Sequence, residues 1–282
     1  MQTVNHIDPL REAVARLRQT GKVALVPTMG ALHDGHMTLV RHAKTLADHV
    51  VVSIFVNPRQ FGVGEDLASY PRPLERDCAM LEAVGVALLW APDVAAMYPA
   101  GYATNVSVSG VSDGLCGAER PGHFDGVATV VCKLFHQVLP DVALFGEKDW
   151  QQLAVIRRMA RDLDLTLPLA SNIVGVPTVR EADGLAMSSR NAYLTPPERA
   201  AAAALPAAMN AAIGRIAADY PVAPALAMLA QDLLAAGFAS VDYAALCDAD
   251  SLAPLDERGN GPARLLVAAR IGKARLIDNM AA

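Results

Sequence analysis

The alternation of short apolar segments with longer amphipathic ones constrains the fold of this chain more than any other feature. Four short segments are rich in β-branched residues and almost wholly apolar: VALVPT (23–28), VVVSIFV (50–56), VALLWAP (86–92) and VALFG (142–146). Such segments are typical of strands buried on both faces. The stretches between them, MTLVRHAKTLADH, PLERDCAMLEAVG and FDGVATVVCKLFHQVLP, have helical spacing. The pattern predicts an α/β fold with a doubly wound parallel sheet, which binds its ligands beyond the carboxyl ends of the strands.

The composition changes after about residue 180. An alanine-rich helical stretch (198–237) leads to SVDYAALC, ARLLVAARI and ARLIDN, which predict two or three short strands. The chain of 282 residues is long enough for two domains. We therefore expect the parallel sheet in residues 1–178 and a smaller C-terminal α+β domain in residues 179–282.

Composition limits the classes of partner. The chain has 53% apolar residues, a formal net charge of −5 and no run of five basic residues, which favours a small-molecule ligand over nucleic acid. The sequence has neither the apolar core of a signal peptide nor a run of 18 apolar residues, so we expect no membrane span. Four cysteines without a C-x-x-C pair are expected to be reduced thiols in a cytoplasmic protein: Cys78, Cys116, Cys132 and Cys247.

The loop after the first predicted strand lies in VPTMGALHDGHMTLV (26–40). Gly30 and Gly35 keep the glycine spacing of a P-loop, but His36 and Met37 replace its lysine and hydroxyl residue, and the G-x-G-x-x-G pattern is absent. His36 falls where a helix should begin, so backbone N–H groups and the helix dipole favour a phosphate there and keep the imidazole neutral. The alternatives for His33 and His36 are a surface pair, or half of a metal site with distant ligands.

The loop after the fourth predicted strand reads GEKDWQQL. Asp149 is placed to cap the following helix. Lys148 beside it works against the helix dipole, which indicates that an anion binds there. The alternative is a solvated lysine whose charge is balanced by Glu147 and Asp149.

A third loop, READGLAMSSRNAYLTPPERA, places two hydroxyls and a guanidinium together at Ser188, Ser189 and Arg190. This combination suits a polyphosphate, to which the arginine can make bidentate contacts. The alternative is that Ser188 or Thr195 caps the next helix.

Together, HDGH in the first loop and MSSR in the third are similar to the HIGH and KMSKS pair of the nucleotidylyl-transferase superfamily. Within that superfamily the chain closely resembles the pantothenate synthetase (pantoate-beta-alanine ligase) family. The resemblance rests on six motifs, in order over residues 26–194: PTMGALHDGH, SIFVNPRQFG, DLASYPRPLERD, LCGAERPGHFDGVATVV, LFGEKDWQQL and DGLAMSSRNAYL. The segment LTLPLASNIVGVP (165–177) departs from the family pattern by being a few residues longer.

The resemblance implies an AMP-forming acid–amine ligase of pantothenate biosynthesis. Its members condense (R)-pantoate with β-alanine in an ATP-dependent reaction, through pantoyl adenylate, and release AMP and pyrophosphate. It also implies a requirement for Mg²⁺, a homodimer, a Rossmann-like N-terminal domain that binds ATP and pantoate, and a C-terminal lid.

The same resemblance assigns roles to individual residues. It implies catalytic roles for His36, His33, Lys148 and Arg190, and it places Asp77 near the magnesium. The ATP-binding set would be Met29, Gly30, Ala31, Leu32, His33, Asp34, Gly35, His36, Gly146, Glu147, Lys148, Asp149, Val179, Met187, Ser188, Ser189 and Arg190. The pantoate and β-alanine pocket would contain Gln60, Gln152, Asn57, Arg120 and His123.

Chemical reasoning agrees with these roles, because attack of a carboxylate on the α-phosphorus needs positioning and charge neutralisation rather than a protein nucleophile. The amides of Gln60 and Gln152 suit the carboxylate and hydroxyls of pantoate. Gln151 and Gln152 are neighbours on the predicted helix, so only one of these two should face the end of the sheet. An exposed position is the alternative for Gln151.

Two other functions stay open. One is a related nucleotidylyltransferase acting on a phosphate-bearing acceptor, and the other is an ATP-binding module without catalytic activity. A tRNA synthetase is disfavoured, because this acidic chain has no evident anticodon-binding region.

Overall fold

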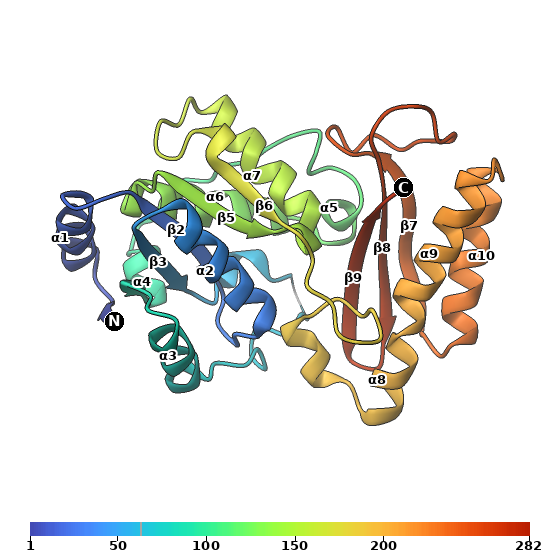
Figure 1. Cartoon of the computed structure of the whole chain (residues 1–282), viewed down its shortest axis with the longest axis horizontal. Coiled ribbons are helices and arrows are strands. Elements are labelled where there is room, and N and C mark those ends of the chain that lie inside the picture. Colours follow the sequence, from blue (N-terminus) through green and yellow to red (C-terminus); the bar gives the residue numbers. More distant parts are fainter. Residues whose placement is uncertain (63) are drawn as a thin grey trace. The chain divides into compact units, whose positions relative to one another are not determined.

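The chain divides into two compact units in the computed structural model, which describes residues 1–62 and 64–282 (Figure 1). Unit 1 comprises Met1–Ser109, Arg120–Glu147 and Val155–Pro177. Unit 2 comprises Gly110–Glu119, Lys148–Ala154 and Thr178–Ala282. Unit 1 therefore ends next to the boundary predicted at residue 178, while two earlier segments join unit 2.

A six-stranded parallel sheet forms the centre of unit 1, with the strand order β1-β4-β3-β2-β5-β6. Its strands are β1 (Gln2–Val4), β2 (Val23–Thr28), β3 (His49–Ile54), β4 (Leu88–Trp90), β5 (Val142–Gly146) and β6 (Ile173–Val176). All pairs are parallel, and β2 pairs with β3 from Val23 opposite His49 to Thr28 opposite Ile54. The predicted α/β class and parallel sheet are thus confirmed, and β2 and β5 have the predicted bounds.

The order in which strands are added to the sheet reverses between β2 and β5. The chain passes from β2 to β3 on one side, whereas β5 pairs with β2 on the other side. In open α/β sheets this reversal leaves a crevice at the carboxyl ends of the two strands, where ligands bind. The loops that follow β2 and β5 are the ones that hold the histidine pair and the E-K-D sequence.

Helices complete unit 1: α1 (Ile7–Arg18), α2 (Asp34–Leu46), η1 (Pro58–Gln60), α3 (Leu74–Ala83), α4 (Val94–Met97), α6 (His123–Val138) and η3 (Ala170–Asn172). The apolar face of α2 is buried through Met37, Leu39, Val40 and Ala43, and α2 contacts β2, β3 and β5. Helix α6 contacts α1, η1 and β2. This packing fixes the start of α2 beside the end of β2.

Two short elements link the units along the chain, η2 (Glu147–Asp149) and α7 (Trp150–Asp162). Helix α7 begins directly after Asp149, the last residue of η2, and the capping role of Asp149 stays a prediction.

Unit 2 contains an antiparallel sheet in the order β7-β8-β9. The strands are β7 (Ser240–Asp248), β8 (Ala263–Ile271) and β9 (Ala274–Ala281), and the helices are α5 (Cys116–Glu119), η4 (Ser189–Tyr193), α8 (Pro196–Ala202), α9 (Ala204–Ala217) and α10 (Val222–Ala235). Helices α9 and α10 pack on each other and contact this sheet (Figure 1). The predicted smaller α+β region is therefore present.

One helical stretch, Pro196–Ala217, has the length and composition of a membrane-crossing helix. Its residues Leu205, Met209 and Ile216 are nevertheless buried in the apolar core of unit 2, together with residues of α10 and the sheet. Its place in the fold is that of an ordinary core helix. All four cysteines are free thiols, as predicted.

Candidate active site

The histidine pair forms a reciprocal cap at the start of α2. Nδ1 of His33 accepts a hydrogen bond from the Gly35 backbone N–H at 3.2 Å, and Nδ1 of His36 accepts one from the His33 backbone N–H at 3.4 Å. The ring centroids lie 4.1 Å apart. These contacts match the tautomer of each ring that accepts at Nδ1 and carries its proton on Nε2. The loop thus places both imidazoles at the positive end of a helix.

A buried carboxylate holds the loop that carries this pair. Asp77 on α3 is 1% exposed, and its two oxygens accept the backbone N–H groups of Ala31 at 2.8 Å and Leu32 at 2.9 Å. Burial raises the pKa of Asp77 above its ordinary value, although the two N–H groups act in the opposite direction. Asp77 therefore joins α3 to the loop after β2, and it lies 46 residues after Ala31 in the sequence.

Gly30 is required where this loop passes Asp77 and Ile54. Its φ is +82°, and a Cβ at this position would lie 3.1 Å from both Asp77 Oδ2 and Ile54 Cγ2. A side chain would be strained by the backbone conformation and crowded by both neighbours. Gly30 therefore serves the turn geometry of this loop.

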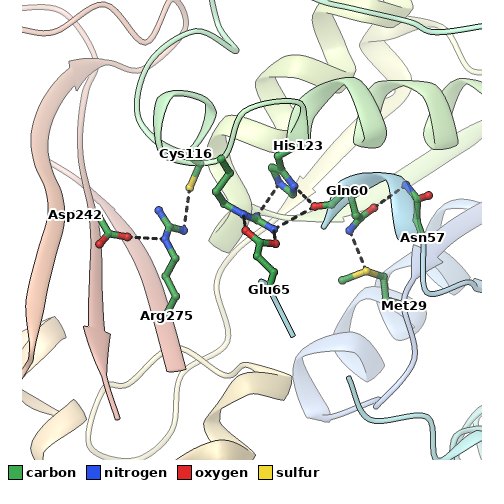
Figure 2. Close-up of polar contacts among 9 residues, drawn as sticks. Met29, Asn57, Gln60, Glu65, Cys116, His123, Asp242 and Arg275 are labelled. Carbon is green, nitrogen blue, oxygen red and sulfur yellow. Dashed lines mark hydrogen bonds and ion pairs between the residues drawn. The ribbon is translucent and has the colours of Figure 1, made fainter. Parts of the chain in front are cut away.

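The loop after β3 presents Gln60, which is 9% exposed. Its Oε1 accepts from Asn57 Nδ2 at 3.1 Å and its Nε2 donates to Met29 Sδ at 2.9 Å, as Figure 2 shows. Asn57 is buried and also donates to the Gly126 carbonyl at 3.0 Å, while it accepts from the Tyr98 hydroxyl at 2.9 Å. Asn57 and Gln60, both predicted for the substrate pocket, are thus brought together with Met29 of the histidine loop.

Helix α6 approaches this loop through a glycine. A Cβ on Gly126 would lie 2.2 Å from the Arg59 carbonyl oxygen and 2.7 Å from the Gln60 backbone nitrogen. Both neighbours are backbone atoms, which cannot move aside as the end of a side chain can. Gly126 therefore sets how closely α6 approaches the segment that carries Gln60.

Arg120 and His123 brace the same segment. Arg120 forms two hydrogen bonds of 2.6 Å with the carboxylate of Glu65 and donates to the Gln60 carbonyl at 3.2 Å. His123 Nδ1 lies 2.7 Å from the same carbonyl oxygen, and its Nε2 lies 3.1 Å from Arg120 Nη1 (Figure 2). The two residues predicted to border the pocket therefore contact the backbone of the residue predicted to bind pantoate.

In unit 2, Lys148 lies in η2 with its side chain 19% exposed, and its Nζ is 3.8 Å from Asp149 Oδ2. Its backbone carbonyl accepts from Asn279 Nδ2 at 2.8 Å. The neighbouring Trp150 donates from its indole to the Ala249 carbonyl at 2.8 Å. The lysine is therefore mostly buried rather than fully solvated, and its backbone is held by a residue of the C-terminal strand.

The segment leading to M-S-S-R is a tight hairpin. Arg180 forms an antiparallel bridge with Ala186, and the Met187 N–H donates to the Val179 carbonyl at 2.9 Å. Ser188 Oγ accepts from the Arg190 N–H at 3.2 Å and caps η4, while Thr195 forms a capping box with Glu198 at α8. Both hydroxyls therefore act as caps, the alternative weighed for them, and Ser189 and Arg190 form the first turn of η4.

The two glutamines of α7 differ in their surroundings. Gln151 is 5% exposed; its Oε1 accepts from the Cys116 N–H at 3.0 Å and its Nε2 donates to the carbonyls of Val111 and Gly114 at 3.0 and 2.8 Å. The exposed position considered for Gln151 is therefore wrong, because the 111–116 loop covers it. Gln152 is half-buried.

Some residues that shape these loops carry no sequence signal. Glu65, Asp278 and Asn279 lie outside the six motifs, and only contacts with distant segments give them a role. Among the described residues, no group of three His, Cys, Asp or Glu side chains forms a metal site. The described part of the chain therefore supplies no further ligands that would complete a metal site around the histidine pair.

The arrangement suits transfer chemistry on phosphate esters. The histidine pair lies at a helix start, Gln60 is braced by its neighbours, and Lys148 is mostly buried. Groups of these kinds suit the binding of phosphates and acids. These features lie on the loops that follow β2, β3 and β5, at the carboxyl ends of the strands.

Sequence and structure comparisons identify the family. The family model for pantoate-beta-alanine ligase matches residues 2–281. Pantothenate synthetase from Novosphingobium aromaticivorans is 68% identical over 99% of this chain and 98% of its own length, and that from Sphingopyxis alaskensis is 60% identical over 99% of both.

Solved structures agree. Pantothenate synthetase from Thermus thermophilus superposes with a TM-score of 0.92 at 49% identity, covering 99% of both chains. Pantoate-beta-alanine ligase from Francisella tularensis, solved with β,γ ATP and β-alanine, gives a TM-score of 0.84 at 32% identity and covers 100% of this chain and 97% of its own. The family match, the identities and the shared fold agree along the full length, and the chain belongs to the pantoate-beta-alanine ligase family.

Proposed function

We propose that this chain is the ligase that condenses (R)-pantoate with β-alanine to form pantothenate. In the first step a pantoate carboxylate oxygen attacks the α-phosphorus of ATP, pyrophosphate leaves, and pantoyl adenylate forms. In the second step the β-alanine amine attacks the acyl carbon, loses a proton, and displaces AMP. The observation that carries the proposal is the reciprocal cap formed by His33 and His36 at the start of α2, in the loop after β2.

The residues take roles that follow from their surroundings. His33 and His36 donate to phosphate oxygens without adding charge, and Lys148 and Arg190 offset the charge that moves toward the leaving pyrophosphate. The whole proposed ATP set, these four residues included, is Met29–His36, Gly146–Asp149, Val179 and Met187–Arg190. No side chain attacks substrate.

Pantoate would be held by amides rather than by a cation. Gln60 is preorganised by Asn57 and by the bracing contacts of Arg120 and His123. Gln152, half-buried on α7, is the second amide. Amides orient the carboxylate and hydroxyls of pantoate and leave the carboxylate nucleophilic, whereas a lysine would hold it in an ion pair.

Mg²⁺ is proposed to enter with the phosphates of ATP, which is the common arrangement for this ion. The described residues form no protein cage for it, and both oxygens of Asp77 already accept backbone N–H groups. Each oxygen keeps a second lone pair, and the position of Asp77 near the magnesium stays a prediction. We further propose a homodimer in the cytoplasm, without nucleic-acid or membrane partners.

Product analysis tests this function. The purified chain is incubated with ATP, Mg²⁺, pantoate and β-alanine, each omitted in turn, and products are identified by mass spectrometry. We expect pantothenate and AMP only in the complete mixture. His42→Ala, an exposed histidine on the same helix, is a matched control for histidine loss.

The same assay, repeated with a phosphate-bearing acceptor in place of pantoate, separates the alternatives. Transfer of a nucleotide to a phosphate-bearing acceptor without amide formation would favour the related nucleotidylyltransferase. ATP binding without release of pyrophosphate would favour a non-catalytic module.

A further inference from the structure

Two adjacent polar residues near the C-terminus are almost completely buried. Asp278 and Asn279 on β9 are 2% and 4% exposed. They pair with Val267 and Leu266 of β8, in a sheet whose other inward positions are mostly apolar. Successive residues of a strand point to opposite faces, so this dipeptide can contact two different segments.

Asn279 reaches the E-K-D segment. Its Nδ2 donates to the Lys148 carbonyl at 2.8 Å, and its Oδ1 accepts from Arg264 Nη1. Arg264 in turn lies over the ring of Trp150, with Cζ 3.4 Å from the ring centroid. The amide is thus oriented by one residue on β8 and holds the carbonyl of the lysine that follows β5.

Asp278 reaches the hairpin that leads to M-S-S-R. Its carboxylate accepts from Arg180 Nη1 at 2.6 Å and Nη2 at 2.9 Å. The same guanidinium donates to the Gly184 carbonyl at 3.0 Å and to the Asn279 carbonyl at 3.4 Å. Arg180 therefore links the turn of the hairpin to two groups on β9, the carboxylate of Asp278 and the backbone carbonyl of Asn279.

A buried ion pair is weak evidence for stability, because apolar residues of similar volume often stabilise as well or better. Its directional bonds, in contrast, fix geometry. We propose that Asp278 and Asn279 are positioning residues for adenylate formation, which hold Lys148 and the Met187–Arg190 segment in one fixed arrangement within unit 2. This inference rests on the proposed function.

The test is made on Asn279, because its amide can be changed without removing a charge pair. Asn279→Asp keeps an oxygen for Arg264 and removes the N–H that binds the Lys148 carbonyl; Asn279→Ala removes both contacts. Asn210→Ala is the matched control, since Asn210 Nδ2 makes a similar bond to the Pro206 carbonyl at 2.9 Å on α9.

We expect both Asn279 variants to lower pantoate-dependent exchange of pyrophosphate into ATP by about 10- to 100-fold, the scale of a small misplacement of a catalytic group. Conversion of supplied pantoyl adenylate and β-alanine should stay close to wild type, as should all rates of Asn210→Ala. When Asn279→Ala is added to Lys148→Ala, the residual exchange rate should fall only slightly more. The reason is that the effects of substitutions at coupled residues do not add.

Several results would overturn the inference. One is a folded Asn279→Asp variant that exchanges pyrophosphate as fast as the wild type. Another is an equal loss of both half-reactions in the Asn279 variants. A third is that Asn279→Ala lowers exchange as much in the Lys148→Ala background as it does in the wild type. Failure of both variants to fold would also overturn it, because the contacts would then serve stability. If instead the wild type shows neither exchange nor pantothenate, the proposed function itself fails.

Discussion

Glu65 and Arg120 form a bidentate ion pair in which Nε and Nη2 of the guanidinium each donate to a carboxylate oxygen at 2.6 Å. Burial by itself would raise the pKa of Glu65, but the hydrogen bonds and charge of Arg120 outweigh it and lower the pKa to about 2. The folded pKa thus lies below the ordinary value of 4.5. The pair therefore contributes stability above the unfolded pKa, and this contribution is lost as the pH falls toward the folded pKa.

The first prediction concerns this pH dependence. Glu65→Gln should be less stable than wild type near neutral pH, and the difference should shrink as the pH falls from about 4.5 to about 2. Urea unfolding of both proteins across this range measures it, with Glu257→Gln as an exposed control. A difference that stays constant over the range would contradict the prediction.

The second prediction concerns His36. Replacing it with alanine removes one preorganised N–H donor from the start of α2, and turnover should fall by at least ~10²-fold. Circular dichroism should show an intact fold, and His42→Ala should retain activity. Near-normal turnover of a soluble His36→Ala variant would exclude His36 from the reaction.

The third prediction concerns Gln60. Gln60→Ala should raise the pantoate requirement far more than the ATP requirement, because polar groups of a buried substrate left without partners cost about 1–3 kcal/mol. Steady-state kinetics with each substrate varied in turn measure the two requirements. Equal weakening of both would mean that Gln60 only shapes its loop.

The fourth prediction concerns Gly126. Gly126→Ala places a methyl group against the backbone of Arg59 and Gln60, so the loop must shift, and we expect a loss of about 1–3 kcal/mol in unfolding free energy. The pantoate KM should rise with it. Gly214→Ala is the control, because its Cβ meets no atom within 4 Å and alanine favours a helix by about 0.5–1 kcal/mol. Equal stability of the two variants would show that α6 can move away from η1.

The fifth prediction separates the two chemical steps. Lys148→Ala and Arg190→Ala should nearly abolish pyrophosphate exchange, because both cations stabilise charge on the leaving pyrophosphate. Both variants should still convert supplied pantoyl adenylate and β-alanine into pantothenate at a substantial rate. Equal loss of both half-reactions would mean that these cations hold the adenylate itself. Absence of exchange in the wild type, with pyrophosphate free to return, would favour a concerted reaction.

Local pattern was sufficient for much of the fold. The β-branched runs of β2 and β5 predicted their bounds, because a strand buried on both faces must be apolar along its whole length. The capping chemistry of Thr195 and the start of α7 after Asp149 were likewise readable from neighbouring residues. The strands β1 (QTV) and β6 (IVGV) were missed, because neither lies in a long apolar run such as the one that contains the equally short β4.

The sequence by itself determined the class of fold, the order of the loops and the residue types that bear on the chemistry. Only the tertiary structure decided that Gln151 is buried under the 111–116 loop, that Asp77 holds the histidine loop, and that Asn279 holds the Lys148 carbonyl. The physical reason is range: periodicity and capping act within a few residues, whereas these hydrogen bonds join positions 37, 46 and 131 residues apart. Such bonds form only after apolar packing has brought the segments together and removed the competing water.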